Sequence, residues 1–190
     1  MIAFLDFEAS SLARRGTPVE VAWVFEDGQG ESHLIRPAPD WTDWSPEAEA
    51  IHGLSRDTLE RDGEPHGDVA HRMLQVLRDH AVFASAPSWD GKWMSVLLRA
   101  SGLPRHALRL RDTDEARRAA ALDLLMPTVP AGQLDAAVAS ILLAASRAVE
   151  SEPPAHRALA DARREHGVWL DIRRRAAAFA ASHSTSEDPR

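Results

Sequence analysis

The chain contains no cysteine and no tyrosine, and Lys92 is the only lysine among its 22 basic residues. Without cysteine it can form no disulfide bond, thiolate metal site or cysteine nucleophile. No uninterrupted apolar run approaches the roughly 18 residues that a membrane-spanning helix needs. The N-terminus begins with a strand-like segment and lacks the basic and apolar regions of a signal peptide. We therefore expect a cytoplasmic protein that does not engage a membrane.

The charge balance is acidic, because 29 aspartate and glutamate residues outnumber the 22 basic ones and give a net charge of −7. This balance disfavours a protein that coats nucleic acid non-specifically. It does not exclude a nuclease, since a carboxylate metal site is itself acidic and phosphate contacts need only a local patch. Arginine binds phosphate well and is clustered three times, although each cluster is equally typical of a solvated helix face or tail. The clusters are Arg14-Arg15, Arg163-Arg164 and Arg173-Arg174-Arg175.

Apolar periodicity predicts a hairpin followed by alternating helices and strands. Strands are expected at residues 2–8, 19–25, 32–35, 81–84 and 108–110, with a Gly-containing turn after the second. Helices are expected at 47–52, 55–61, 69–78, from Asp90 to about 101, and at 113–125, 134–145 and 157–179. This order implies one α/β sheet domain, which we place at residues 1–181, followed by a polar, disordered tail at 182–190.

Two carboxylates lie two residues apart on the first predicted strand, in the run Ile2-Ala3-Phe4-Leu5-Asp6-Phe7-Glu8. Side chains alternate between the faces of a strand, so Asp6 and Glu8 point the same way. Neighbouring like charges on a buried strand repel each other and lose hydration. A bound divalent cation relieves both costs, and carboxylate oxygens suit Mg²⁺ or Mn²⁺. An acidic pair at a sheet edge is the alternative interpretation.

Asp90 follows a predicted buried strand and opens a predicted helix. This position suits a metal ligand that projects toward a neighbouring strand end. It equally suits a helix N-cap, which is a common use of aspartate.

His156 and Asp161 are five residues apart, which on one helix would separate them by about 140°. The Pro153-Pro154 pair instead places His156 at or just before the helix start, with Asp161 fixed within the helix. Histidine is the side chain best suited to take a proton from water near neutral pH. Taken alone, His156 would more simply be a surface histidine, because the chain has nine.

Taken in order, these residues resemble the DEDDh, or DnaQ-like, 3′–5′ exonuclease family. That family has Asp-x-Glu on its first strand, a middle Asp, and His-x-x-x-x-Asp near the C-terminus. The matching residues are Asp6, Glu8, Asp90, His156 and Asp161. Ile51-His52-Gly53-Leu54 is similar to the family's His-Gly-Ile segment, and Asp112-Thr113 to its Asp-Thr. The sister DEDDy group needs a tyrosine, which this chain lacks. The similarity covers about residues 2–172.

The resemblance implies a ribonuclease H-like α/β fold, with a central mixed sheet, an antiparallel hairpin edge and flanking α-helices. It implies that Asp6, Glu8, Asp90 and Asp161 hold two divalent ions, Mg²⁺ or Mn²⁺, and that His156 is the general base. The implied reaction is hydrolysis at the 3′ end of single-stranded DNA or RNA, releasing nucleoside 5′-monophosphates. The substrate-binding positions that it implies are Ala9, Ser10, Ser11, Leu12, His52 and Trp89. No feature of the sequence identifies a homodimer interface or a partner subunit.

The chain departs from the family pattern at two places. Ala9-Ser10-Ser11-Leu12 stands where the family has Thr-Thr-Gly-Leu beside the 3′-terminal nucleotide. Ala86-Pro87-Ser88-Trp89-Asp90 stands where it has Asn-x-x-Phe-Asp. The first change alters the backbone path, and the second keeps the aromatic residue but loses the amide.

Other residues suggest nucleic-acid contacts with weaker support. Trp41 and Trp44 flank a loop where an indole could stack on a base, although packing against the sheet is the commoner role of such a residue. Arg157 and Arg163 flank the last motif and could contact phosphates, or could pair with nearby acids.

Two other functions fit parts of the sequence. The altered segments after Glu8 and before Asp90 are compatible with a catalytically silent nucleic-acid-binding or regulatory module on the same fold. The second alternative is a small-molecule phosphatase with Asp6 as its nucleophile, because many such enzymes carry a nucleophilic aspartate on a strand. The retained His156 argues against a silent module, which has no need of a general base.

Overall fold

The computed structural model describes residues 1–149 and 155–184, and these fall into two compact units. The first comprises residues 1–112 with 155–163, and the second comprises 113–149 with 164–184. The sheet and all the candidate site residues lie in the first unit. The single domain at 1–181 spans both units and stays a prediction.

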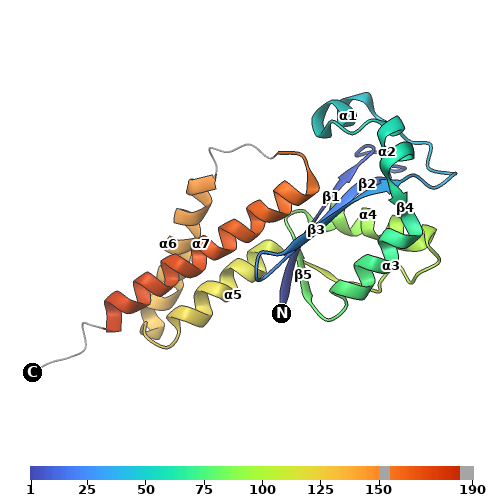
Figure 1. Cartoon of the computed structure of the whole chain (residues 1–190). Coiled ribbons are helices and arrows are strands. Elements are labelled where there is room, and N and C mark those ends of the chain that lie inside the picture. Colours follow the sequence, from blue (N-terminus) through green and yellow to red (C-terminus); the bar gives the residue numbers. More distant parts are fainter. Residues whose placement is uncertain (150–154, 185–190) are drawn as a thin grey trace, which may run out of the picture. The chain divides into compact units, whose positions relative to one another are not determined.

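Six strands form one mixed sheet, which confirms the predicted α/β class (Figure 1). In chain order they are β1 (Ile2–Ala9), β2 (Pro18–Phe25), β3 (Gly30–Arg36), β4 (Glu64–Pro65), β5 (Ala81–Ala84) and β6 (Leu110–Asp112). The spatial order is β4-β3-β2-β1-β5-β6. β1, β2 and β3 are antiparallel neighbours, whereas β5 runs parallel to β1 and β6 parallel to β5. The short β4 was not expected, and β6 begins two residues later than predicted.

The two faces of β1 have different chemistry, because side chains alternate along the strand. Odd-numbered residues such as Leu5 and Phe7 join the main hydrophobic core with residues of α3 (His66–Leu77) and α4 (Pro87–Ala100). Even-numbered residues point to the opposite face, which places Asp6 and Glu8 there. The register sets Glu8 directly opposite Glu20 of β2. One face of β1 therefore joins the main core, and the other carries the two carboxylates together with the buried Phe4.

Two short helices lie near the N-terminal end of β2, with a small core of Val19, Leu54 and Leu59 beneath them. They are α1 (Pro46–His52) and α2 (Arg56–Asp62), as the sequence predicted. Serine hydroxyls cap both helices, Ser45 on α1 and Ser55 on α2.

α4 begins at Pro87, three residues before the predicted start. Proline suits the first helical position, because the N–H that it lacks would have no partner in the helix. Asp90 therefore lies inside the first turn, with its side chain buried, and Ala86 occupies the N-cap position. The N-cap interpretation of Asp90 is wrong.

The second unit contains α5 (Thr113–Leu125), α6 (Ala131–Val149) and the C-terminal part of α7 (Ala158–Ser184). A partly buried ion pair joins α5 to α7, with Arg117 Nη2 2.6 Å from Glu165 Oε2. Residues 182–184 of the predicted tail are helical, and 185–190 lie outside the described residues. By length and composition alone α6 is long and apolar enough to cross a membrane, although no apolar run of that length was expected from the sequence. The core helix of a soluble protein can have the same length and composition.

The loop that joins β1 to β2 closes tightly through backbone contacts. Ser10 N–H donates to the Thr17 carbonyl at 2.8 Å, and Ser45 N–H donates to the Ser10 carbonyl at 2.9 Å. A Cβ atom on Gly16 would lie 2.2 Å from the Ser11 carbonyl oxygen. Only glycine fits where the two sides of this loop approach each other.

We expect Gly16→Ala to lower the free energy of unfolding by about 1–3 kcal/mol, because the added methyl group meets backbone that cannot move aside cheaply. Urea denaturation monitored by circular dichroism measures this change. Gly67→Ala in α3 is the matched control, since a Cβ there meets nothing within 4 Å. An equal loss in both variants would contradict the proposed close approach.

Candidate active site

Three of the predicted metal ligands lie together. Ligand oxygens of Asp6, Glu8 and Asp161 are all within 4.8 Å of one another, and each residue is partly buried. Asp6 and Glu8 come from β1, and Asp161 comes from the first turn of α7. The fold thus joins residues more than 150 positions apart in the sequence into one acidic cluster.

Asp90 lies beside this cluster and is only 2% exposed. Its Oδ1 accepts a hydrogen bond from the Phe7 N–H at 3.2 Å, between the two acidic residues of β1. Its Oδ2 is buried and accepts no hydrogen bond from the residues that the structure describes. Burial raises the pKa of Asp90 from 3.8 to about 7, against the effect of its backbone hydrogen bonds. A buried carboxylate oxygen without a protein partner is suited to an ion or a bound water.

Glu20 is a site residue that the sequence analysis missed. It is 1% exposed and accepts hydrogen bonds from Arg157 Nε at 3.1 Å and Nη2 at 2.9 Å. It also accepts from the Ala158 N–H at 3.0 Å. The sequence does contain a sign of this role, because Glu20 is an acidic residue within the apolar run of β2. That strand is buried from Pro18 to Val24. Arg157, considered as a phosphate contact, is instead engaged with this carboxylate.

The pKa of Glu8 is raised from 4.5 to about 7. Burial is the largest cause, followed by the negative charges of Asp161 and Glu20, while Arg157 acts in the opposite direction. Without a cation, this arrangement therefore favours a protonated Glu8 near neutral pH.

His156 is exposed and has a left-handed backbone, with φ of 53°. Non-glycine residues rarely adopt this conformation, and neighbouring contacts must hold it. Those contacts come from Asp161, whose Oδ1 accepts from the Ala155 N–H at 3.0 Å and whose Oδ2 accepts from the Arg157 N–H at 3.2 Å. The same carboxylate that joins the acidic cluster therefore fixes the backbone on both sides of His156.

The segment after β1 is held by hydrogen bonds within the protein. Ser10 and Ser11 are buried, and both hydroxyls donate to Asp43 Oδ2, the Ser10 bond being 3.2 Å long. Ser10 Oγ also accepts from the Thr17 N–H at 2.9 Å. Ala9 is buried, whereas Leu12 is 69% exposed. Leu12 is thus the one side chain of this predicted substrate segment that is openly available to a ligand.

His52 and Trp89, also predicted to bind substrate, differ in exposure. His52 is buried, and its Nδ1 accepts from the Leu54 N–H at 3.0 Å. Burial lowers the pKa of His52, with the Ala9 backbone, Glu20 and Glu49 opposing, so the ring is neutral at pH 7. Trp89 is 40% exposed and stacks on Trp93, with ring centroids 5.7 Å apart.

The loop tryptophans pack inside the protein. Trp41 belongs to the main core and is 6% exposed. Trp44 packs against the small core beneath α1 and α2, and its Nε1 donates to Glu49 at 2.6 Å. Packing, the commoner role of such a tryptophan, is what the structure shows for both.

Of the three arginine clusters, the two in α7 are partly engaged by neighbouring groups. Arg174 and Arg175 pair with Asp171, and Arg173 lies over the Trp169 ring at 4.8 Å. Arg164 donates to the Val149 carbonyl at 3.1 Å, and Arg163 is exposed. Arg14 and Arg15 are both exposed as well.

The donors fit a hard divalent cation. Mg²⁺ and Mn²⁺ prefer carboxylate oxygens, and the cluster supplies three carboxylates with a fourth, Asp90, beside it. Two further observations support a cation at this site. The pKa values of Glu8 and Asp90 are raised, and Oδ2 of Asp90 accepts no hydrogen bond from the described residues. A bound cation would stabilise the ionised carboxylates and give this oxygen a partner.

Comparison with solved structures shows where this architecture occurs elsewhere. A product-bound exonuclease I is 18% identical, with a TM-score of 0.53 over 67% of this chain and 33% of that chain. Exonuclease I from Methylocaldum szegediense is 17% identical, with a TM-score of 0.53 over 67% and 30%. E. coli exonuclease I in complex with a dA16 oligonucleotide is 18% identical, with a TM-score of 0.52 over 67% and 30%. The fold is ribonuclease H-like.

This chain spans about a third of the length of those exonuclease I chains. No protein-family model matches its sequence, and no curated protein does. The ribonuclease H-like fold expected from the five-residue resemblance is thus established by structural similarity, and membership of a particular nuclease family is a separate proposal.

We expect Glu20→Gln to lower the free energy of unfolding by about 1–3 kcal/mol. The amide has one acceptor oxygen, so its NH₂ group would face donors on Arg157 and Ala158 that the carboxylate now satisfies. Denaturant titration measures the loss. The matched control is Glu31→Gln, which breaks the more exposed pair with Arg72 and should cost less than about 1 kcal/mol. Similar losses for the two variants would show that Glu20 is not a buried anchor.

The raised pKa values of Glu8 and Asp90 set a pH dependence of stability. Well below the ordinary pKa values of 3.8 for Asp90 and 4.5 for Glu8, both groups are protonated in the folded and unfolded states alike. Between there and about pH 7 the unfolded chain loses protons that the folded chain keeps, so stability of the cation-free protein falls as pH rises. A cation binds the ionised carboxylates, so Mg²⁺ or Mn²⁺ should stabilise the protein more at about pH 8 than at about pH 5.

Thermal unfolding in chelator, and with added Mn²⁺ at each pH, measures both effects. Asp6→Asn is the comparison variant, in which the gain from Mn²⁺ should largely disappear. Equal stabilisation of wild type and variant by Mn²⁺ would place cation binding elsewhere on the chain.

Proposed function

We propose that the protein is a metal-dependent 3′–5′ exonuclease of the DEDDh type that trims single-stranded nucleic acid in the cytoplasm. One observation carries the proposal: carboxylate oxygens of Asp6, Glu8 and Asp161 converge within 4.8 Å, with Asp90 alongside. The ribonuclease H-like fold that the chain shares with exonuclease I supports it.

In this proposal Asp6, Glu8, Asp90 and Asp161 hold two divalent ions, Mg²⁺ or Mn²⁺. Such ions activate water and stabilise the leaving oxygen of a phosphodiester. A carboxylate offers about four lone-pair positions, and the backbone hydrogen bonds of Asp161 use two of them. Asp161 can therefore hold the His156 segment and serve as a ligand at the same time.

His156 is the proposed general base, which takes the proton from the attacking water. Its exposure allows contact with water and substrate, and its flanking backbone is fixed by Asp161. Glu20 is a positioning residue in this scheme, because it acts through the Arg157 side chain and the Ala158 backbone. The burial of Glu20 supports a fixed path for the chain from His156 into α7.

The proposed substrate is the 3′ end of a single strand. Solved complexes of E. coli exonuclease I contain dA16 and dT13 oligonucleotides. In this chain the exposed Leu12 and Trp89 come from the loop after β1 and the start of α4, the segments that lead away from the acidic residues. We propose that they contact the terminal bases, since apolar and aromatic faces bind bases with little sequence preference.

We expect purified protein with Mn²⁺ or Mg²⁺ to shorten 5′-labelled single-stranded DNA or RNA from the 3′ end in one-nucleotide steps. Asp6→Asn should abolish the ladder. His156→Ala should lower turnover by about 10²–10⁴-fold while leaving binding of Mn²⁺ and oligonucleotide nearly unchanged. Gel time courses with both sugars, and calorimetric titration of Mn²⁺, supply the readouts.

Asp79→Asn is the control for the loss of one carboxylate, because Asp79 is exposed and pairs only with neighbouring Arg78 in the part of the chain described. Oligonucleotide binding without hydrolysis under all conditions would favour the silent module. Turnover of simple phosphomonoesters but not oligonucleotides would favour the phosphatase.

A further inference from the structure

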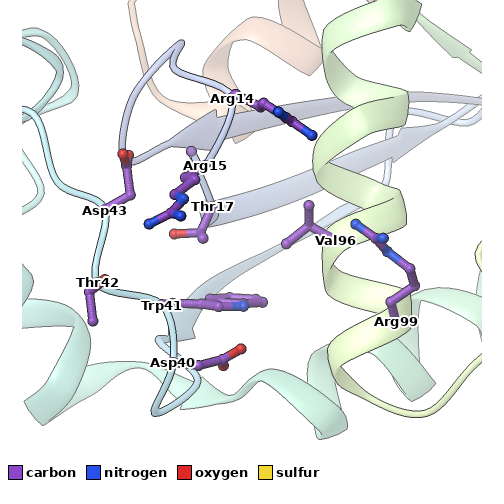
Figure 2. A pocket seen from close by; sticks show the side chains of 10 residues that line it. Arg14, Arg15, Thr17, Asp40, Trp41, Thr42, Asp43, Val96 and Arg99 are labelled. Carbon is purple, nitrogen blue, oxygen red and sulfur yellow. The ribbon is translucent and has the colours of Figure 1, made fainter.

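A cavity of about 290 Å³ lies beside the loop between β1 and β2. Its walls come from that loop, from residues 40–43 after β3, and from α4 (Figure 2). Trp41 lies at one side, Arg14 extends from the loop toward α4, and Arg99 projects from α4 into the same space (Figure 2). None of the acidic cluster residues lines this cavity.

Positive charge gathers at this cavity, in a protein whose net charge is −7. Arg14, Arg15 and Arg99 all line it, and all three are exposed. Among residues 1–149 and 155–184, none of the three forms an ion pair with an acidic side chain. Arg99 uses only its Nε, which donates to the Ser95 carbonyl at 3.3 Å. Exposed guanidinium groups without acidic partners are suited to bind phosphate.

Two carboxylates also line the cavity, Asp40 and Asp43. Asp43 accepts hydrogen bonds from the hydroxyls of both Ser10 and Ser11, so its Oδ2 is directed into the loop. Three arginines against two acids leave the lining positive. Arg14 and Arg15 enter the cavity from the loop, and Arg99 enters it from α4. This arrangement suits a polyanion, whose charges are spread along a chain, better than a single compact ion.

One face of α4 runs from the cavity to the start of the helix, where Asp90 lies. Trp89, Lys92, Val96 and Arg99 follow one another at spacings of three or four residues, which places them on a single face of the helix. Lys92 Nζ lies 5.1 Å from the Trp89 ring centroid and donates to the Ala13 carbonyl at 2.5 Å. Asp90, one residue after Trp89, reaches β1 through the Phe7 N–H.

The length of this face matches a short stretch of single strand. From Asp90 to Arg99 the helix rises about 13.5 Å, and a stacked strand advances about 3.4 Å per phosphate. On this measure Arg99 lies roughly four nucleotides from Asp90. The order along α4 is an aromatic ring, an ammonium group and then guanidinium groups, which suits a base next to the 3′ end and phosphates further upstream.

We propose that Arg14, Arg15 and Arg99 bind the phosphate backbone of the nucleic-acid strand about four nucleotides upstream of the 3′ end. This inference rests on the proposed exonuclease function for its direction, because it places the 3′ end at Asp6 and Glu8. It gives the enzyme a minimum length for tight substrate binding. The three arginines contact the strand and take no part in the reaction.

The first test measures oligonucleotide binding by fluorescence anisotropy in chelator, where the protein cannot hydrolyse its ligand. The variant is R14Q/R15Q/R99Q, and the control with the same change in charge is R61Q/R78Q/R105Q, at exposed arginines outside the cavity. Affinity of the first variant for a strand of about 12 nucleotides should fall at least about tenfold at low salt, and its salt slope should decrease by about 2. Binding of a trinucleotide should be unchanged.

The second test locates the contact on the strand. A neutral methylphosphonate linkage about four positions from the 3′ end should weaken binding to wild type and have little effect on R14Q/R15Q/R99Q. The same linkage near the 5′ end should affect neither protein. Equal binding of the long strand by wild type and R14Q/R15Q/R99Q would overturn the proposal. A variant that lost affinity for inorganic phosphate but not for the strand would also overturn it, by assigning the cavity to a free anion.

Hydrolysis of a trinucleotide with Mn²⁺ separates this proposal from the proposed function. R14Q/R15Q/R99Q should cleave it at the wild-type rate and lose activity only on longer strands. If wild type cleaves no substrate, the exonuclease proposal fails, while the binding measurements still decide the role of the arginines. If both proteins cleave long strands equally well, the exonuclease stands and the proposed phosphate contacts are wrong.

Discussion

Repulsion among buried carboxylates is the constraint on which the rest of the site depends. The register of β1 and β2 sets Glu8 opposite Glu20, and α7 adds Asp161 to the same region. Arg157 neutralises Glu20, which is the most buried of the three. The negative charge that remains near Glu8 is stabilised by a proton or by a cation. The contacts of Glu20 with Arg157 and Ala158 therefore bear on the chemistry proposed for Asp6, Glu8 and Asp161.

Most of the fold and part of the site could be predicted from the sequence, because the relevant signals are local. Alternation along residues 2–8 places Asp6 and Glu8 on one face, and the proline pair before His156 predicts the helix start that the structure has at Ala158. The partnership of Glu20 with Arg157 could not be read in this way, since it joins residues 137 positions apart. The sequence carried only an indirect sign of it, an acid within an apolar strand.

Other misses have the same physical origin. Asp90 suits an N-cap by local rules, yet α4 begins at Pro87 and the buried side chain of Asp90 reaches β1 instead. Ser11, which stands where the DEDDh pattern has glycine, is accommodated because its hydroxyl donates to Asp43 and the close approach falls on Gly16. In each case a contact across the fold decided the outcome, and the roles of Asp90 in binding metal and of Ser11 in binding substrate remain predictions.

The first unit is assembled from two separate stretches of chain, residues 1–112 and 155–163. β1 precedes His156 and Asp161 by more than 140 positions in the chain, so the strand carboxylates are synthesised before the other two residues. A nascent or truncated chain that ends before residue 155 has the strand carboxylates without the third member of the cluster and without the proposed base. The acidic centre therefore cannot be complete until both stretches of the first unit have been synthesised.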